Sequence, residues 1–228
     1  MRLKKWDDLP EKMQNDAVKK YYDSLSKKKG SLFLKRIFDM VGSILLLILL
    51  SPVFLILAVI IKLDSRGPIF FRQVRVTQYG RTFRIFKFRT MVNDADKIGS
   101  QVTTQNDSRV TKVGHFLRKY RLDEIPQLLN ILIGDMSFVG TRPEVEKYVQ
   151  AYTDEMMATL LLLAGVTSEA SIEYKDEEKI LTNINDVDKI YIEKVLPEKM
   201  TYNLKYMKNY RILKDFIIIV KTLITVIQ

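Results

Sequence analysis

One uncharged apolar stretch constrains this chain more than any other feature. It runs for 22 residues, from Met40 to Ile61, between Asp39 and Lys62. A helix of that length matches the hydrocarbon core of a bilayer, which is about 30 Å thick. The stretch starts well inside the chain, lacks a small-residue cleavage site and is too long for the core of a signal peptide, so we expect the chain to retain it.

Both flanks of this stretch are basic. The cations on the two sides are Lys27, Lys28, Lys29, Lys35 and Arg36 before it, and Lys62, Arg66, Arg72 and Arg75 after it. A flank that is translocated across a membrane is normally poor in lysine and arginine. The charge pattern therefore places both ends of the stretch on the cytoplasmic side.

A serine and a proline interrupt the apolar stretch at Ser51-Pro52. The proline removes an amide donor and clashes with the preceding turn, while the serine hydroxyl can satisfy the carbonyl that is freed. Together with the flanks, this break predicts a helix that bends and leaves the membrane by the face it entered. A plain spanning helix with a proline kink is the alternative, since membranes tolerate such kinks.

The rest of the chain predicts short elements around this membrane segment. Residues 1–30 are dense in charge and read as a solvated or interfacial helical appendage. The aromatic and branched residues of Pro68 to Val76 and of Thr82 to Thr90 predict a hairpin, with Lys87 and Arg89 on one face of its second strand. The polar stretch from Asn93 to Arg109 predicts a loop.

Two short amphipathic helices are expected next, because apolar residues recur at helical spacing. Their apolar positions are Val113, Phe116, Leu117 and Tyr120, then Ile125, Leu128, Leu129 and Leu132, with Gly134 as a stop. Met156 to Val166 is apolar but too short to span, so it is core or a membrane-surface helix. Val195 to Met207 predicts a helix, and Ile212 to Ile227 is amphipathic and suits an interface or a core face.

These elements predict a mostly helical α/β fold. It combines a re-entrant helix-break-helix with a small cytoplasmic domain that carries the hairpin and interfacial helices. The expected parts are a charged N-terminal appendage over residues 1–30, the re-entrant membrane hairpin over 31–66, and a catalytic domain over 67–228.

Composition narrows the chemistry. The net charge of +10 favours an anionic partner, which could be nucleic acid, an anionic membrane surface or a phosphorylated substrate. No basic stripe with interleaved aromatics occurs, so nucleic acid is not expected. The absence of cysteine excludes disulfides and thiolate chemistry, the lone His115 cannot make a histidine metal site, and no glycine-rich dinucleotide or Walker loop is present.

A pair of carboxylates, Asp123 and Glu124, lies in the joint between the two short helices. Ordinary helix-start chemistry explains them as an N-cap and a first-turn acid ahead of Pro126. Alternatively, a carboxylate beside Arg118 and Arg121 is held ionised and can attack phosphorus, with the cations neutralising the diphosphate it attacks.

A second candidate element is the loop from Gly134 to Pro143. Its glycines let backbone amides approach a phosphate, and Arg142 can grip one through two hydrogen bonds, although a structural turn is the simpler explanation. Lys87 and Arg89 would form a third cationic element, or else a solvated strand face. Asp94-Ala-Asp96 and Asp186-Val-Asp188 match the Asp-x-Asp pattern of metal-dependent glycosyltransferases, which arises easily in a charged chain.

Taken together, the motifs resemble the bacterial sugar transferase family of monotopic phosphoglycosyl transferases. The resemblance covers roughly residues 35–150 and is carried by Lys35-Arg-Ile-Phe-Asp39, Ser51-Pro52, Phe86-Lys-Phe-Arg-Thr-Met91, Arg118 with Leu122-Asp-Glu-Ile-Pro-Gln-Leu-Leu-Asn130, and Gly134-Asp-Met-Ser-Phe-Val-Gly140 with Arg142-Pro143.

The resemblance implies transfer of a sugar phosphate from a UDP-sugar to undecaprenyl phosphate, through a covalent phosphosugar-aspartyl intermediate with release of UMP. Asp123 would be the nucleophile, and Glu124 its partner in Mg²⁺ binding or proton handling. Lys87, Arg118 and Arg142 would hold phosphate groups, and Ser51-Pro52 would break the membrane helix. The expected location is one leaflet of the bacterial inner membrane, as a monomer or homo-oligomer whose cytoplasmic domain initiates a cell-surface glycan.

One segment departs from the family pattern. Many members carry a Pro-Gly-Ile-Thr-Gly stretch preceded by a basic residue, where this chain has Leu163-Ala-Gly-Val-Thr-Ser168. A cation and a proline are therefore missing near the expected donor site, and the sugar is not identified. A non-catalytic adaptor that binds anionic lipid is the alternative function, but it gives the phosphate-loop residues no purpose.

Overall fold

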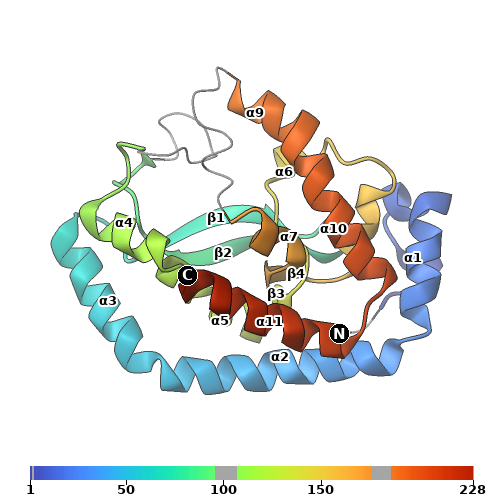
Figure 1. The fold of residues 1–228 in the computed structure, drawn as a ribbon, viewed down its shortest axis with the longest axis horizontal. Helices are drawn as coiled ribbons and strands as arrows, with labels where there is room; N and C mark the ends of the chain where they lie inside the picture. The colour runs from blue at the N-terminus through green and yellow to red at the C-terminus, as the bar shows by residue number, and fades with distance from the viewer. Residues whose placement is uncertain (2, 96–106, 176–185, 228) are drawn as a thin grey trace.

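The computed structural model describes residues 1, 3–95, 107–175 and 186–227 (Figure 1). Asp96, the second aspartate of Asp94-Ala-Asp96, lies outside them. So does most of the loop expected between Asn93 and Arg109.

The apolar stretch forms two helices joined at a bend. Helix α2 spans Lys29–Leu49 and α3 spans Ser51–Asp64, and their axes are bent by 62°. Pro52 lies in the first turn of α3, and the Ser51 hydroxyl donates to the carbonyl of Ile48 at 2.8 Å. The predicted break is therefore confirmed. In the described ranges no single helix is long and apolar enough to cross a bilayer, but the bent pair passes that test together.

Helix α2 buries polar side chains and exposes apolar ones, the opposite of the pattern in a helix of a soluble protein. Its buried face carries Lys35, Asp39 and Ser43, spaced four residues apart. Asp39 Oδ1 accepts hydrogen bonds from Ser137 Oγ at 3.0 Å and from the amide of Phe138 at 3.1 Å. Its exposed face is apolar, with Phe33, Leu34, Ile37, Val41, Ile44, Leu45, Ile48 and Leu49. Polar contacts thus dock α2 on the rest of the protein.

The hairpin is present as predicted. Strand β1, Phe70–Val76, pairs antiparallel with β2, Thr82–Phe88, across a turn at Gln78–Gly80 (η3). Arg89 follows β2 and is buried. Its guanidinium donates to the carbonyls of Ser65 at 2.7 Å and Arg66 at 2.9 Å, at the end of α3. The prediction that Arg89 shares a cationic or solvated face with Lys87 is therefore wrong, because Arg89 binds the carbonyls at the end of α3.

Two short helices follow, as expected. They are α4, Lys112–Lys119, and α5, Gln127–Ile133, joined by the 3₁₀ turn η5, Leu122–Glu124. Gly134, with φ of 102°, ends α5. The Asn130 side chain accepts from the amide of Phe86 at 2.8 Å and donates to the carbonyl of Arg84 at 3.1 Å, so α5 is fixed to the outer edge of β2.

A second sheet supports the loop that follows it. Strand β3, Met136–Val139, is parallel to β4, Ala164–Thr167. The strands meet so closely that a Cβ on Gly165 would lie 2.1 Å from the nitrogen of Gly140, so glycine is required there. Between them lie α6, Glu146–Val149, and η6, Met156–Leu161. Residues 158–161 are buried, so the apolar Met156 segment belongs to the core.

The C-terminal elements complete the fold. They are α7 (Glu169–Glu173), α9 (Val187–Ile190), the π-helical turn η7 (Tyr191–Val195), α10 (Leu196–Lys208) and α11 (Ile212–Ile227). Helix α10 confirms the helix predicted there. Helix α11 lies against α2 (Figure 1), where Asp215 and Lys35 form a buried ion pair at 2.6 Å.

The N-terminal residues are part of the core. Helix α1, Asp16–Ser26, follows two 3₁₀ turns at Trp6–Asp8 (η1) and Glu11–Met13 (η2). One face of α1 is buried against η6 and α10, and the buried side chains of this region are Leu3, Leu9, Met13, Val18, Tyr21, Tyr22 and Leu25. The predicted helix is therefore present, but the prediction that it is solvated is wrong for this face, because its apolar side chains pack into the core.

Candidate active site

Four of the predicted site residues meet in one cluster. Strand β2 brings Lys87, the turn η5 brings Asp123 and Glu124, and the loop after β3 brings Arg142. Lys87 Nζ lies 2.9 Å from Glu124 Oε1 and 3.9 Å from Asp123 Oδ2, and Arg142 Nη2 lies 2.5 Å from Glu124 Oε1.

Local backbone geometry presents Asp123 to this cluster. Arg121 adopts a left-handed conformation, with φ of 53°, which ends the preceding helix and starts η5. Helix α5 begins four residues after Asp123, at Gln127, with Pro126 as its N-cap and no side-chain cap. The interpretation of Asp123 as an N-cap is therefore wrong.

The Asp123 carboxylate is buried with one oxygen unused. Its Oδ1 atom has no hydrogen-bond partner among the described residues, although the residue is only 7% exposed. Buried polar atoms in folded proteins are nearly always paired, and exceptions occur at catalytic sites. An unpaired carboxylate oxygen is what a nucleophile at this position requires.

The two carboxylates differ in their electrostatics. Burial raises the pKa of Asp123, and the neighbouring charge of Glu124 raises it further, against the opposing effects of Lys87 and Arg118. Burial also acts to raise the pKa of Glu124, but Arg142 and Lys87 together hold that pKa well below its usual range. Glu124 is thus the carboxyl group that stays ionised. Asp123 is the one whose pKa is raised and whose protonation is more sensitive to neighbouring charges.

Arg118 lies at the border of the cluster. It projects from α4, and its Nε donates to Thr90 Oγ1 at 3.0 Å. Its positive charge lowers the pKa of Asp123, so it acts on the site electrostatically. Ser51 and Pro52 lie at the bend between α2 and α3.

The Arg142 loop is held by backbone hydrogen bonds to β4. The amide of Gly140 donates to the carbonyl of Thr167 at 3.0 Å, and the amide of Gly165 donates to the carbonyl of Thr141 at 2.9 Å. The segment Leu163 to Ser168, where the chain departs from the family pattern, therefore supports this loop through its backbone. That contact needs the glycine at 165, which this chain keeps.

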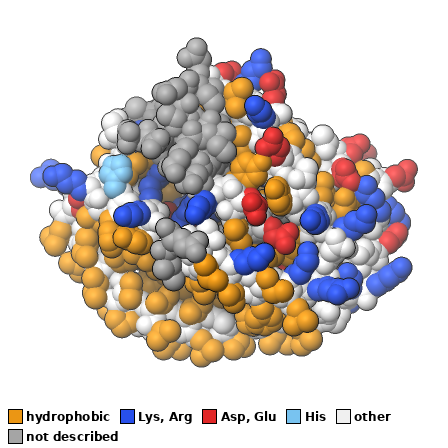
Figure 2. Space-filling model, viewed as in Figure 1, with side chains coloured by type: hydrophobic (Ala, Val, Ile, Leu, Met, Phe, Trp, Pro, Cys, Tyr) orange, Lys and Arg blue, Asp and Glu red, His pale blue; other side chains and the backbone are white. Residues whose placement is uncertain are grey.

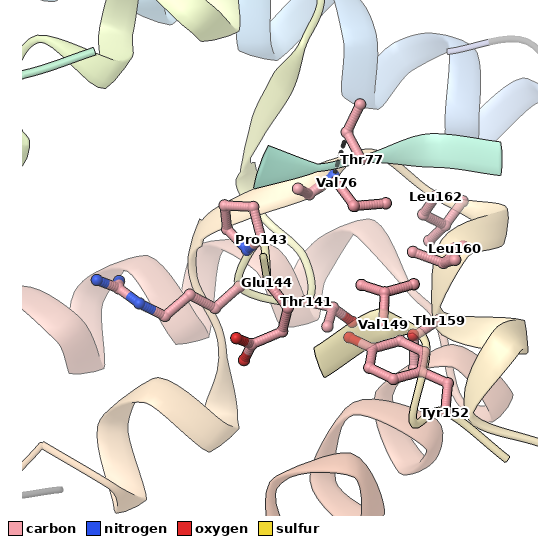
Figure 3. Close-up of a pocket in the computed structure, with 12 residues that line it drawn as sticks. Val76, Thr77, Thr141, Pro143, Glu144, Val149, Tyr152, Thr159, Leu160 and Leu162 are labelled. Carbon is pink, nitrogen blue, oxygen red and sulfur yellow. Dashed lines mark hydrogen bonds between the residues drawn. The ribbon is translucent and has the colours of Figure 1, made fainter. Parts of the chain in front are cut away.

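A small cavity lies behind the loop. The side chains of Thr141, Tyr152 and Thr159 gather around it (Figure 3), and its volume is about 10 Å³. That space is far too small for a nucleotide sugar. A substrate would reach the cluster from the side of Lys87 and Arg142, because these side chains are 21% and 31% exposed to solvent.

Sequence reasoning missed a buried polar network beside the loop. Glu144 accepts a hydrogen bond from the Tyr191 hydroxyl at 2.6 Å, and Lys199 Nζ donates to the same hydroxyl at 2.9 Å. Arg75 donates to the carbonyl of Pro143 at 3.3 Å. These residues come from β1, the loop after β3, η7 and α10 and share no motif, so no sequence signal marks the network.

The structure also bears on the metal predictions. Asp186 caps α9 by accepting from the amide of Lys189, and Asp188 accepts from Lys147 and Tyr148, so this Asp-x-Asp pattern is structural. No group of three or more histidine, aspartate or glutamate side chains suited to a metal occurs in the described ranges.

A magnesium ion fits the cluster in part. Mg²⁺ is usually bound by one or two carboxylates together with water and substrate phosphates. The unpaired Oδ1 of Asp123 fits such a ligand set. Glu124 does not, because its oxygens already accept from Lys87 and Arg142.

Comparison with known proteins gives a consistent result. A family model described as bacterial sugar transferase matches residues 30–228. The chain is 35% identical over 198 residues to the UDP-N-acetylgalactosamine-undecaprenyl-phosphate N-acetylgalactosaminephosphotransferase of Aeromonas hydrophila, covering 86% of this chain and 44% of that protein.

Two further relatives differ in their coverage. The UDP-glucose:undecaprenyl-phosphate glucose-1-phosphate transferase of Escherichia coli K12 is 35% identical over 217 residues, covering 93% of this chain and 44% of the relative. The exopolysaccharide production protein ExoY of Sinorhizobium fredii is 34% identical over 204 residues, covering 83% of each. The chain thus spans less than half the length of the first two relatives.

Proposed function

Because this chain belongs to the bacterial sugar transferase family, we propose that it transfers a sugar phosphate from a UDP-sugar to undecaprenyl phosphate and releases UMP. The observation that carries the proposal is the buried, unpaired oxygen of Asp123 beside Lys87. The names of two relatives support the same reaction class, and ExoY supports a role in building an exopolysaccharide.

The proposed reaction has two displacement steps at one phosphorus atom. In the first, an Asp123 carboxylate oxygen attacks the phosphorus that bears the sugar. The new O–P bond forms as the bond to the UMP oxygen breaks, and UMP leaves with that electron pair. In the second, an oxygen of the lipid phosphate attacks the same phosphorus, and the bond to Asp123 breaks and restores the carboxylate.

The cations of the cluster would stabilise the charge that develops in both steps. Glu124, the neighbour of Asp123 in the chain, pairs with both Lys87 and Arg142, so the positions of these cations are fixed before substrate arrives, which is how preorganised sites lower a barrier. Arg118 favours the ionised form of Asp123. Asp123 would be the carboxylate ligand of Mg²⁺, and a bound ion would supply further positive charge against the phosphates.

A membrane location for the site is part of the proposal. The exposed apolar residues of α2 continue on α3 and α11, and those of α11 are Leu213, Phe216, Ile217, Val220, Leu223 and Ile224. Figure 2 shows apolar side chains gathered along the edge formed by α2 and α3. A patch of this extent is typical of a membrane or protein interface. We propose that the bent pair enters one leaflet of the inner membrane and returns to the cytoplasmic side.

Cysteine labelling tests this topology, because the chain contains no cysteine. The reporters are Lys29→Cys, at the start of α2, and Arg66→Cys, after α3, both at exposed positions. An impermeant maleimide should label both in inverted membrane vesicles and neither in intact spheroplasts. Labelling of the two reporters from opposite sides would instead show a spanning helix.

The activity is tested with the purified chain, undecaprenyl phosphate and a panel of UDP-sugars that includes UDP-N-acetylgalactosamine, UDP-glucose and UDP-galactose. UMP should be released with at least one donor, and Asp123→Asn should abolish the release. Asp154→Asn, at an exposed aspartate, is the matched control and should leave it unchanged. Binding to anionic vesicles with no UMP release from any donor would favour the adaptor function.

A further inference from the structure

Five buried side-chain atoms in the described part of the chain lack a hydrogen-bond partner. They are Asp39 Oδ2, Arg89 Nε, Asp123 Oδ1, Gln127 Nε2 and Thr141 Oγ1. A buried donor or acceptor left without a partner costs the fold about 1–3 kcal/mol, so each needs a reason. Two of the five atoms belong to Asp123 and Gln127, which are four residues apart where η5 runs into α5.

The backbone places these two side chains on the same side. Ile125 and Pro126 are helical and join η5 to α5 without interruption. Residues four apart on a helical turn face the same way. Asp123 is 7% exposed and Gln127 is 1% exposed. No hydrogen bond joins them, since both atoms remain unpaired.

The unused hydrogen-bonding atoms of Asp123 and Gln127 are complementary. Asp123 offers a free acceptor oxygen, and Gln127 offers an N–H donor without an acceptor. An amide donor cannot serve as a ligand to a cation, so a metal ion would leave it unsatisfied. A phosphoryl group would satisfy both, because its phosphorus can bond to the carboxylate oxygen while one of its own oxygens accepts from the amide.

We propose that Gln127 is a catalytic residue whose side-chain amide donates a hydrogen bond to a non-bridging oxygen of the phosphoryl group transferred to Asp123. The inference rests on the proposed function. The hydrogen bond forms as the O–P bond to Asp123 forms, and it stabilises the negative charge on the phosphoryl oxygens until the lipid phosphate displaces Asp123.

Gln127→Met tests the proposal, because methionine keeps the length of the side chain and removes the donor. Loss of one such donor typically lowers the rate by about 10²-fold, and we expect that loss in kcat for UMP release, with KM for the UDP-sugar changed far less. Gln127→Glu, which puts an anion against the phosphoryl group, should lower kcat at least as far. Gln150→Met, at an exposed glutamine, is the control and should match the unchanged chain.

Thermal unfolding separates a catalytic from a structural role. Gln127→Met removes an unpaired buried polar group, so its Tm should equal or exceed that of the unchanged chain. A lower Tm with a parallel loss of activity would assign Gln127 to the fold and overturn the proposal, as would full activity in Gln127→Met. If the unchanged chain releases no UMP from any donor, the proposed function fails first and the role of Gln127 fails with it.

Discussion

Arg142 and Glu124 form a two-point contact, with Nη2 2.5 Å from Oε1 and Nη1 3.4 Å from Oε2. The same carboxylate accepts from Lys87 at 2.9 Å. One anion therefore fixes two cations from different elements, the strand β2 and the loop after β3. Glu124 is thus a central organiser of the cluster, and its neighbour Asp123 is left with a free oxygen.

The pH dependence of donor turnover should report the pKa of Asp123. Attack requires the ionised carboxylate, so the rate of UMP release rises with pH through that pKa. Because burial raises it, we expect the acid limb above the usual aspartate value of about 3.9. Lys87 lowers this pKa and Glu124 raises it, so Lys87→Met should move the limb to higher pH and Glu124→Gln to lower pH. The check is kcat/KM measured across pH. Shifts in the same direction would contradict the assignment.

Removal of the Asp123 charge should not destabilise the protein. The folded-state pKa of this group is raised, so the folded state favours the protonated form and stability is lost as pH rises from the unfolded-state pKa through the folded-state pKa. At neutral pH Asp123→Asn should therefore have a Tm equal to or above that of the unchanged chain, and the difference should vanish below pH 4. Scanning calorimetry in detergent at both pH values measures it. A Tm lowered at neutral pH would mean that Asp123 supports the fold.

The sequence could predict the elements that depend on local chemistry. The bend at Ser51-Pro52, the hairpin and the stop at Gly134 follow from backbone rules that act within a few residues. The family resemblance assigns Lys87 and Asp123 to one site, but no local pattern predicts that the two side chains pair. The geometry of the pair depends on Asn130, which fixes α5 to the edge of β2.

Features that depend on tertiary packing could not be predicted in this way. The charge density of residues 1–30 suggested solvation, yet Val18 and Leu25 are fully buried. Arg89 looked like a partner of Lys87 because strand residues alternate, but the strand ends at Phe88 and the guanidinium turns to α3. In both cases the determining neighbours are distant in the sequence, which a local pattern does not contain.

Gly67 should be intolerant of substitution. Its φ is +131°, and a Cβ there would lie 2.0 Å from Arg89 Nη1, which caps the end of α3. Gly67→Ala would strain the backbone and displace that cap, so we expect a loss of roughly 1–3 kcal/mol in unfolding free energy. Gly30→Ala is the matched control, because nothing lies within 4 Å of its Cβ position and alanine favours a helix. Equal stabilities for the two variants, from denaturant titration, would contradict the role given to Arg89.

The buried ion pair between Lys35 and Asp215 should couple α2 to α11. The two side chains are 2% and 4% exposed and lie 2.6 Å apart, and Asp215 also accepts from the hydroxyl of Tyr206 at 2.7 Å. Removing one partner leaves a buried charge unpaired, so Lys35→Met should cost about 3–5 kcal/mol.

The double variant Lys35→Met with Asp215→Asn should recover part of that loss, because the Asp215 charge is removed together with its partner and the asparagine oxygen can still accept from Tyr206. A double-mutant cycle on unfolding free energies measures the coupling. The exposed pair of Lys20 and Glu155, also 2.6 Å apart, is the reference, and Lys20→Met should cost under about 1 kcal/mol because water screens that pair. If the losses of unfolding free energy at Lys35 and Asp215 were additive, the ion pair would not couple α2 to α11. The contacts of Asp39 with Ser137 and Phe138 would then hold α2 in place.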